Sequence, residues 1–376
     1  MSRLDELIAK FCPNGVKYRE LKDILIIKNG KDYKNLTEGK YPVYGSGGIM
    51  TYVSSYVYDK PSVLIPRKGS IDKLYYVEEP FWNVDTIFYT EIDEEKVIPR
   101  YVYFCLQKEH LEQYNTAGGV PSLTQKVLNR VKLPVPPLEV QREIVHILDS
   151  FTLLTAELTA ELTARKKQYN FYRDTLIQKG CKSEKVKLNT ICEIYDGTHQ
   201  TPKYTNSGIP FVSVENIDDL YGTQKFISPE AYEKYKIKPR TGDVFMTRIT
   251  AGIIGKCTVV DRDDDLAYYV SLALLRPNTE VVDSKYLKYY LESGWGRREL
   301  SKWILWDATP TKINKDDIGR VLISVPPLDT QKRLVQVIEH FDAICTDLNI
   351  GLPAEIEARQ KQYEYYRDLL FSFPKP

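Results

Sequence analysis

Two short segments place cations beside hydroxyl groups at matching points of the chain. The first reads PRKGS (66–70) and the second reads TRIT (247–250), and each follows an apolar run. Lysine and hydroxyl side chains suit phosphate oxygens, while the planar fork of arginine can hold guanine through two hydrogen bonds. These segments therefore predict contacts with phosphates and bases. The predicted contact residues are Arg67, Lys68, Ser70, Thr247 and Arg248.

Further polar, basic segments extend this prediction. GGVPSLTQK (118–126) and ATPTKINK (308–315) form a second matched pair, and DGTHQTPKY (196–204) has no counterpart in the first half of the chain. For any one of these segments a plain solvated turn remains an open alternative. The further predicted contact residues are Ser122, Thr124, Gln125, Lys126, His199, Gln200, Lys203, Thr311, Lys312, Asn314 and Lys315.

Motifs for catalysis are weak by comparison. GIIGKC (252–257) resembles the end of a phosphate-binding loop but lacks its first glycine and its final Ser or Thr, so a turn beside a strand is the better interpretation. YGSGG (44–48) favours a hairpin. The acidic runs 92–96 and 263–265 are read as solvated loops, with a nuclease metal site as the alternative. We predict no catalytic residue, no metal site and no cofactor in this chain.

Composition limits the class of protein. The 376 residues suit two or three domains, and no apolar run approaches the length of a membrane span. The first residues, MSRLDELIAKF, lack a signal-peptide core, and the six cysteines are scattered, so we expect a soluble cytoplasmic protein with reduced thiols. Because 52 basic residues nearly balance 51 acidic ones, any surface for nucleic acid must be local.

A duplicated helix must position these segments. VPPLEVQREIVHILDSF begins at Val135 and returns as VPPLDTQKRLVQVIEHF at Val325, while ARKKQYNFYRDTL begins at Ala164 and returns as ARQKQYEYYRDLL at Ala358. Apolar residues at steps of four and three indicate a helix laid against another helix. We expect Gly351 and Pro353 to break the second copy.

The two helix copies each need an apolar partner, and each can supply it to the other. We predict that they pack as an antiparallel coiled coil. The alternative is that each helix caps only its own globular domain. In both cases the helices position the β-rich sections of the chain.

Each long helix follows a section of short β-type runs. In the first section these runs are 23–27, 51–58, 62–65 and 85–90, before a helix at 99–114, and in the second they are 208–217, 242–248, 256–261 and 269–276, before a helix at 284–293. SVLIPR (62–67) matches DVFMTR (243–248), so the sections share a framework with different loops. The chain is therefore an α+β tandem of a β-rich domain and a long helix, which predicts internal pseudo-twofold symmetry.

Together these features resemble the specificity subunit of a type I DNA restriction-modification system. The resemblance covers nearly the whole chain and is carried by the duplicated PPL-x-x-Q start of the long helix, its QY-x-x-YRD-x-L end, GIPFVSVENI, GDVFMTR and KINKDDI. The first section departs from this pattern, with GKYPVYGSGGI from Gly39 in place of GIPFVSVENI.

The resemblance implies a fold and a function. It implies a first target-recognition domain (1–134), a central spacer helix (135–180), a second target-recognition domain (181–324) and a C-terminal helix (325–376). The chain would be a non-catalytic reader of a bipartite, asymmetric site in double-stranded DNA. Two modification subunits with S-adenosylmethionine would methylate adenine there, and restriction subunits with ATP and Mg²⁺ would join them.

The helices would dock those partners and set the spacing between half-sites. The residues implied in docking or spacing are Pro136, Pro137, Leu138, Gln141, Tyr169, Tyr172, Pro326, Pro327, Leu328, Gln331, Tyr363 and Tyr366. Two rival interpretations stay open. One is an enzyme that modifies or cuts DNA with its own hidden active site, and the other is a scaffold that does not bind DNA.

Overall fold

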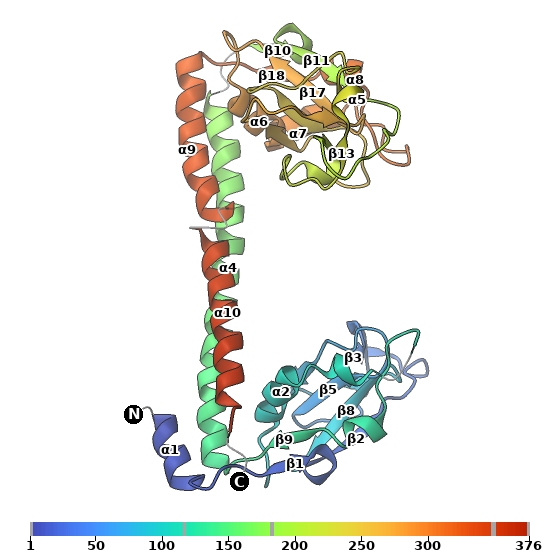
Figure 1. Cartoon of the computed structure of the whole chain (residues 1–376), viewed down its shortest axis with the longest axis vertical. Coiled ribbons are helices and arrows are strands. Elements are labelled where there is room, and N and C mark those ends of the chain that lie inside the picture. Colours follow the sequence, from blue (N-terminus) through green and yellow to red (C-terminus); the bar gives the residue numbers. More distant parts are fainter. Residues whose placement is uncertain (1–2, 116–117, 181–183, 347–350, 374–376) are drawn as a thin grey trace. The chain divides into compact units, whose positions relative to one another are not determined.

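The computed structural model describes residues 3–115, 118–180, 184–346 and 351–373. The chain divides into two compact units, which Figure 1 shows in sequence colours. Unit 1 comprises residues 1–159 and 355–376, and unit 2 comprises residues 160–354. The C-terminal segment therefore completes the unit in which the chain begins.

Unit 1 contains three small sheets. A four-stranded sheet has the order β2-β8-β5-β6, a three-stranded sheet has the order β4-β3-β7, and β1 pairs with β9. Among the strand pairs of the described residues of unit 1, only β3–β7 is parallel. The strands are β1 (Tyr18–Glu20), β2 (Leu25–Asn29), β3 (Glu38–Gly45), β4 (Gly48–Val53), β5 (Ser62–Pro66), β6 (Tyr75–Val77), β7 (Trp82–Asn83), β8 (Ile87–Ile92) and β9 (Lys132–Pro134).

Unit 2 repeats this topology strand for strand. Its four-stranded sheet has the order β11-β17-β14-β15, its three-stranded sheet β13-β12-β16, and β10 pairs with β18. The strands are β10 (Lys185–Lys187), β11 (Cys192–Asp196), β12 (Ile209–Val212), β13 (Phe226–Ile227), β14 (Val244–Thr247), β15 (Cys257–Val259), β16 (Ala267–Tyr268), β17 (Leu272–Pro277) and β18 (Leu322–Ser324). The predicted duplication is confirmed. The pseudo-twofold axis and the domain limits at 134, 180 and 324 stay predictions.

The helices follow the same repeat. Unit 1 holds α1 (Arg3–Phe11), α2 (Pro99–Lys108) and α3 (Gln125–Leu128), whereas unit 2 holds α5 (Pro229–Tyr232), α6 (Ser284–Glu292), α7 (Gly294–Ser301), α8 (Lys315–Gly319) and α9 (Leu328–Thr346). The long helix α4 (Leu138–Gly180) passes from unit 1 into unit 2, and α10 (Leu352–Leu370) ends in unit 1. Among the described residues, every helix is too short or too polar to span a membrane.

Within each unit, α4 packs against a C-terminal helix through one repeated ring pair. In unit 1, Phe151 of α4 stacks on Tyr366 of α10, with ring centroids 5.5 Å apart and planes at 23°. In unit 2, Tyr172 of α4 stacks on Phe341 of α9 at 5.8 Å and 24°. The paired helices run in opposite directions (Figure 1). The predicted antiparallel packing is confirmed in each unit.

The helix seam also closes the core of each unit. Ile144 and Leu148 of α4 and Phe371 beyond α10 are buried in the same cluster as the strands and α2 of unit 1. Ile177 of α4 and Ile338 of α9 have the same place in unit 2. Each helix pair thus also covers its own β-rich section, as the alternative interpretation expected.

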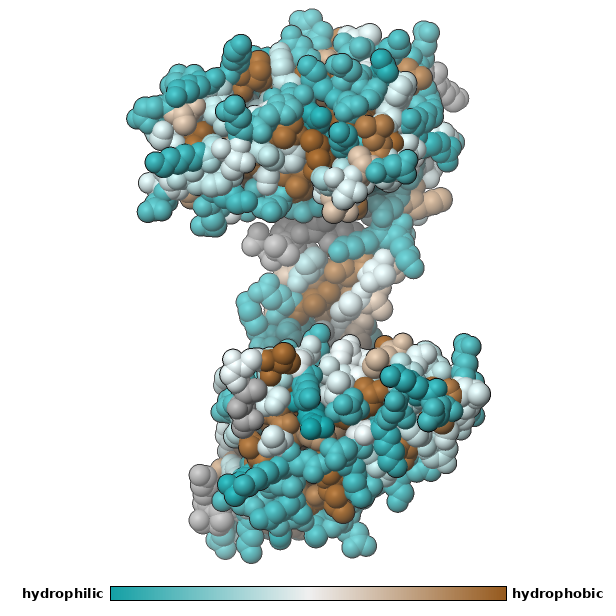
Figure 2. All heavy atoms as spheres, turned by 90° about the vertical axis from the view of Figure 1, so that its right-hand side faces the viewer, coloured by the Kyte–Doolittle hydropathy of each residue, from teal (hydrophilic) through white to brown (hydrophobic). Residues whose placement is uncertain are grey.

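The surface of the face drawn in Figure 2 is mostly hydrophilic, with small apolar patches.

Three local predictions have clear outcomes. The helix predicted at 99–114 was wrong in length, because α2 ends at Lys108 and His110 adopts a left-handed φ of 46° before a 3-10 turn at Leu111–Tyr114. The hairpin predicted at 44–48 is confirmed by pairing of Gly45 with Gly48. The break was predicted at Gly351 and Pro353: Gly351 lies outside the helices, α10 begins at Leu352, and Pro353 lies in its first turn. Residues 347–350 lie outside the described residues.

Candidate nucleic-acid interface

The two predicted contact segments of unit 1 lie side by side. The segment after β5 and the segment before α3 pair through their backbones, because Leu123 N donates to Arg67 O at 2.9 Å and Gly69 N donates to Pro121 O at 3.0 Å. An antiparallel bridge joins Lys68 to Ser122. Segments separated by about fifty residues of sequence therefore form one polar, basic surface.

Unit 2 builds the same arrangement from the matching residues. Ile313 N donates to Arg248 O at 2.9 Å, and Thr250 N donates to Thr311 O at 3.0 Å. A bridge joins Ile249 to Lys312. Because both pairs of segments meet at the end of equivalent strands, β5 and β14, the matched character of these loops in the sequence reflects a shared position in the fold.

The two matched arginines differ in their surroundings. Arg67 is half-buried, with its guanidinium 5.8 Å from the centre of the Phe88 ring. Arg248 is only 6% exposed, pairs with the carboxylate of Asp196, and donates from Nε to Ile313 O at 3.2 Å. Arg248 is thus engaged within unit 2 and is not open to a base, contrary to our expectation for this side chain.

Thr247 is likewise turned into the fold. It is buried, and its hydroxyl donates to Ile253 O at 2.6 Å. Thr124 is the N-cap of α3, where its hydroxyl accepts from Val127 N at 3.4 Å, and Gln125 Nε2 donates to Ile27 O at 3.2 Å. These three side chains therefore have local structural roles that the sequence pattern does not reveal.

The remaining predicted contact residues are accessible. The exposed ones are Lys68, Lys126, His199, Gln200, Lys203, Asn314 and Lys315. The half-buried ones are Ser70, Ser122, Thr311 and Lys312. Cations near both pairs of segments thus reach solvent, as phosphate contacts require.

The segment 196–204 lines a surface groove of unit 2. Thr198, Gln200 and Lys203 form one wall of this groove, and Lys234 and Lys236 lie along it from the stretch after α5. These two lysines are not among the predicted contact residues, although the alternating cations of EKYKIKPR (233–240) are a visible signal. The groove is therefore a further basic surface of unit 2.

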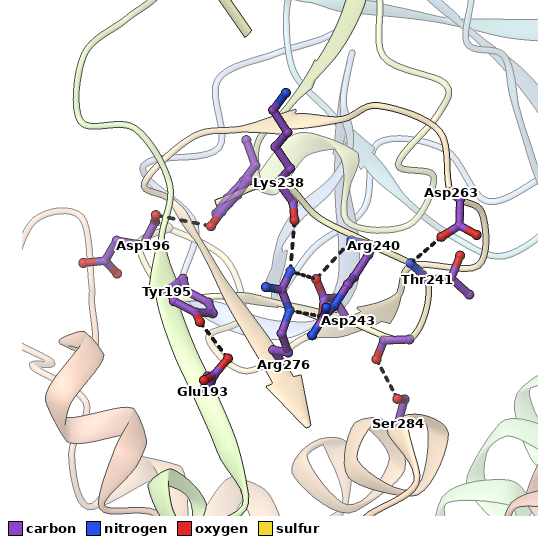
Figure 3. A network of polar contacts seen from close by, with 12 residues as sticks. Glu193, Tyr195, Asp196, Lys238, Arg240, Thr241, Asp243, Asp263, Arg276 and Ser284 are labelled. Atoms are coloured by element: carbon purple, nitrogen blue, oxygen red, sulfur yellow. Dashed lines mark hydrogen bonds and ion pairs between the residues drawn. The ribbon is translucent and has the colours of Figure 1, made fainter. Parts of the chain in front are cut away.

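An ion-pair network fixes the basic stretch beside this groove (Figure 3). Arg276 of β17 donates to the two carboxylate oxygens of Asp243 at 2.9 and 2.7 Å and to Lys238 O at 2.9 Å. Asp243 also accepts from Arg240 N at 3.1 Å. The Asp243 carboxylate raises the pKa of Arg276 above its ordinary value. This pairing holds the stretch 238–243 on the sheet, directly after the segment that carries Lys234 and Lys236.

The predicted docking residues at the start of the long helices fall into two groups. Pro136, Gln141, Pro326 and Gln331 are buried, Leu138 and Leu328 are half-buried, and Pro137 and Pro327 are exposed. Gln141 Nε2 donates to Pro136 O at 2.7 Å, and Gln331 Nε2 donates to Pro326 O at 2.7 Å. Both glutamines are occupied within the chain, and the exposed prolines leave this turn accessible beside them.

The tyrosines of the QY-x-x-YRD-x-L motif also differ. Tyr363 is buried and Tyr169 half-buried, whereas Tyr172 and Tyr366 have exposed edges beyond their stacked rings. Burial raises the pKa of Tyr363 to about 12 and also raises that of Tyr169. Neighbouring Phe171 and Tyr365, which are not among the predicted docking residues, are each 64% exposed. The aromatic edges on these helices are therefore open to contact.

The acidic residues weighed as a metal site can be compared with the part of the chain that the structure describes. No group of three His, Cys, Asp or Glu side chains lies close enough there to hold an ion. The acidic run 263–265 instead includes Asp263, whose carboxylate accepts from Thr241 N at 3.1 Å. That carboxylate has a lowered pKa because of its hydrogen bonds with Thr241.

Comparison with known proteins points to one family. The model of the type I restriction modification DNA specificity domain matches residues 13–165 and again residues 182–358. The type I restriction enzyme EcoR124I/EcoR124II specificity subunit of Escherichia coli is 33% identical over 314 residues, covering 76% of this chain and 74% of that protein. A putative type I restriction enzyme specificity subunit of Haemophilus influenzae is 29% identical over 353 residues, covering 89% of each chain.

Solved structures agree on the fold. The type I restriction-modification system S subunit from M. genitalium has a TM-score of 0.54 at 14% identity, covering 96% of this chain and 98% of its own. A chain from a study of complex assembly and conformational transition of a type I restriction-modification system has a TM-score of 0.64 at 17% identity, with the same coverage. With two family domains and a relative 33% identical over 76% of the chain, this chain belongs to the family of type I restriction-modification DNA specificity subunits, which are the non-catalytic, DNA-recognising components of those systems.

Proposed function

We propose that each unit reads one half of a bipartite, asymmetric DNA site. The observation that carries the proposal is the meeting of two polar, basic segments at the end of equivalent strands in both units, with different side chains in each. A shared framework with unlike loops suits two unlike half-sites. Phosphate contacts from Lys68, Lys126 and Lys315 would set the register, and base contacts would set the sequence.

We further propose which partners act on the recognised site. Two modification subunits carrying S-adenosylmethionine dock on the helix pairs and methylate adenine, and restriction subunits using ATP and Mg²⁺ join them. The exposed aromatic edges of Phe171, Tyr172, Tyr365 and Tyr366 support docking there, because aromatic side chains are enriched at protein interfaces. Chromosomal DNA as the target favours a cytoplasmic location.

The test is to map methylated adenines in the genome of a strain that expresses this chain together with its modification subunit. The proposal expects one motif with two specified parts and an unspecified spacer. A contiguous motif would contradict two separate readers. Methylation without any motif would contradict sequence reading itself.

A second measurement separates the rival classes. The purified chain alone should neither methylate nor cut DNA, whereas the complex should bind DNA with an affinity that falls as salt rises. Cleavage or methylation by the chain alone would support an enzyme. Salt-independent, negligible binding by the complex would support a scaffold.

A further inference from the structure

The edge strand β4 of unit 1 exposes apolar side chains without protection. Its sequence, GIMTYV, contains no charged residue, and Ile49, Met50 and Tyr52 are 51%, 57% and 49% exposed. The strand has β3 on one side and no partner on the other among the described residues. Natural edge strands usually carry charges that prevent unwanted pairing, so an uncharged apolar edge marks a contact surface.

Met50 stands out from this strand because of a β-bulge. Val43 pairs with Thr51 and Tyr44 pairs with Ile49, so Met50 is the extra residue on its side. A bulge re-aims the side chain that it inserts. The Met50 side chain also lies close to Gly45, where an added Cβ would come 2.7 Å from the Met50 sulfur. Because Gly45 has no side chain, the Met50 side chain can occupy this position.

The hairpin tip is anchored at the same residue as the basic loop of unit 1. Ser46 N donates to the Thr86 hydroxyl at 3.3 Å, and Arg67 N donates to Thr86 O at 2.8 Å. Tyr75 OH donates to Ser46 O at 3.2 Å, which fixes the tip from the other side. An added Cβ on Gly69 would lie 3.5 Å from the Ser46 hydroxyl, so the tip touches the loop that holds Lys68.

Resting on the proposed function, we propose that the β3–β4 hairpin enters the major groove and that Met50 reads a thymine through its C5-methyl group. The major groove admits a two-stranded β-ribbon, and thymine is the standard base that presents a methyl group there. The exposed cation of Lys68 beside the tip complements the phosphates that flank the groove. A flexible thioether side chain packs well against such a methyl group.

In the described residues of unit 2, the equivalent strands β12 and β13 form a much shorter pairing. Ile209 pairs with Ile227 and Pro210 with Phe226, and Phe211 N donates to Lys225 O at 2.8 Å. The Met50 contact therefore applies to a single half-site, the one read by unit 1. That asymmetry makes the inference easy to test, because the other half-site serves as an internal control.

The experiment uses the complex of this chain with its modification subunits and duplexes bearing the site found by methylation mapping. Each thymine of both half-sites is replaced in turn by uracil, which lacks only the methyl group. For the wild-type complex we expect one replacement, in one half-site, to weaken binding about four-fold, the equivalent of one buried methyl group. A site without thymine in either half, or without any uracil effect, would overturn the inference.

Variants then assign the effect to Met50. Met50→Ala should bind the thymine and uracil duplexes equally, and Gly45→Ala should reduce the difference because its Cβ displaces the Met50 sulfur. Ile26→Ala removes an equally exposed apolar side chain of unit 1, at 57%, and should keep the four-fold difference. A Met50→Ala complex that still discriminates thymine from uracil contradicts the assignment.

Two further outcomes are distinguishable. If Met50→Ala prevents assembly with the modification subunits, β4 is a protein contact and the inference is wrong. If the wild-type complex binds a scrambled duplex as tightly as its own site, the proposed function itself fails. Binding of the site with no role for Met50 leaves the proposed function intact and removes only this contact.

Discussion

The side-chain carbonyl of Gln141 accepts a hydrogen bond at 2.9 Å from the backbone N–H of Ile98, which precedes α2. The amide of Gln141 also donates to Lys96 O at 3.1 Å, so one side chain joins the start of α4 to the β-rich section of unit 1. In unit 2, Gln331 accepts from Asp283 N at 2.8 Å and donates to Val281 O at 2.9 Å. The PPL-x-x-Q motif is therefore a repeated joint between domain and helix.

Loss of this joint should weaken one unit at a time. Gln141→Ala leaves a backbone N–H and two carbonyls without their buried partner, and we expect a loss of about 1–3 kcal/mol in the free energy of unfolding. Hydrogen exchange at the Ile98 amide should accelerate while the Asp283 amide keeps its protection, and Gln331→Ala should do the reverse. The exposed Gln178→Ala serves as the control. Unchanged protection of Ile98 in Gln141→Ala would contradict the joint.

Substitutions of the matched arginines, Arg67 and Arg248, should have different effects on DNA binding and on stability. Arg67→Ala should weaken DNA binding by about 1–3 kcal/mol and relax the choice of base at one position if the side chain grips a base, with little change in stability. Uniform weakening across sequences would indicate a phosphate contact instead. Competition binding with single-base variants of the site distinguishes these results.

Arg248→Ala should mainly lower the stability of unit 2. It leaves Asp196 without its cation, and we expect the free energy of unfolding of unit 2 to fall by about 2–3 kcal/mol. Urea unfolding of the variant measures this loss. A stable variant with altered base choice would show that Arg248 leaves its ion pair to reach DNA.

These differences show what the sequence could and could not predict. The repeated fold was predictable because helix periodicity and the matched strands are visible along the chain. The burial of Arg248 was not, because its partner Asp196 lies 52 residues away in sequence and only the sheet brings the two together. Helix α2 stops early at a left-handed His110, which helix propensity does not signal. Lys234 and Lys236 were visible as cations, but their position on a groove depends on packing around α5.

A half-buried carboxylate predicts a pH dependence for unit 2. Burial raises the pKa of Asp342 on α9, against the attraction of Lys288 and Arg173. Because the folded pKa exceeds the unfolded value of about 3.9, ionised Asp342 costs stability near neutral pH, and this cost disappears below about pH 4. Asp342→Asn should therefore unfold at higher urea than the wild type at neutral pH. The advantage should shrink as pH falls, and an advantage independent of pH would contradict this cause.

The tandem TAEL repeat (155–158 and 159–162) predicts that the length of the helix sets the spacer between the two half-sites. It lies in the continuous helix α4, and the limit between the units falls between Thr159 and Ala160. A third copy would lengthen the helix by about 6 Å and rotate the C-terminal part of α4 by about 40°. One base pair of DNA advances the double helix by about 3.4 Å and rotates it by about 34°. The added rotation matches that of one base pair, and we give it more weight than the added length. We therefore expect the unread spacer to grow by one base pair, with both half-sites unchanged.

Methylation mapping of the proteins with two and three TAEL copies decides the matter. Identical spacers would show that TAEL is only a favourable helix sequence. Changed half-site bases would show that reading and spacing are not separate. Some loss of stability is expected, because four added residues shift the seam against the partner helix.

The most direct test of two independent readers is an exchange of the first β-rich section. Residues 16–133 are replaced by the matching section of a relative with a different known site, and methylated adenines are mapped in cells that express the hybrid with its modification subunit. The account predicts that one half of the recognised site changes to that of the relative, while the other half and the spacer stay the same. A change in both halves would contradict it.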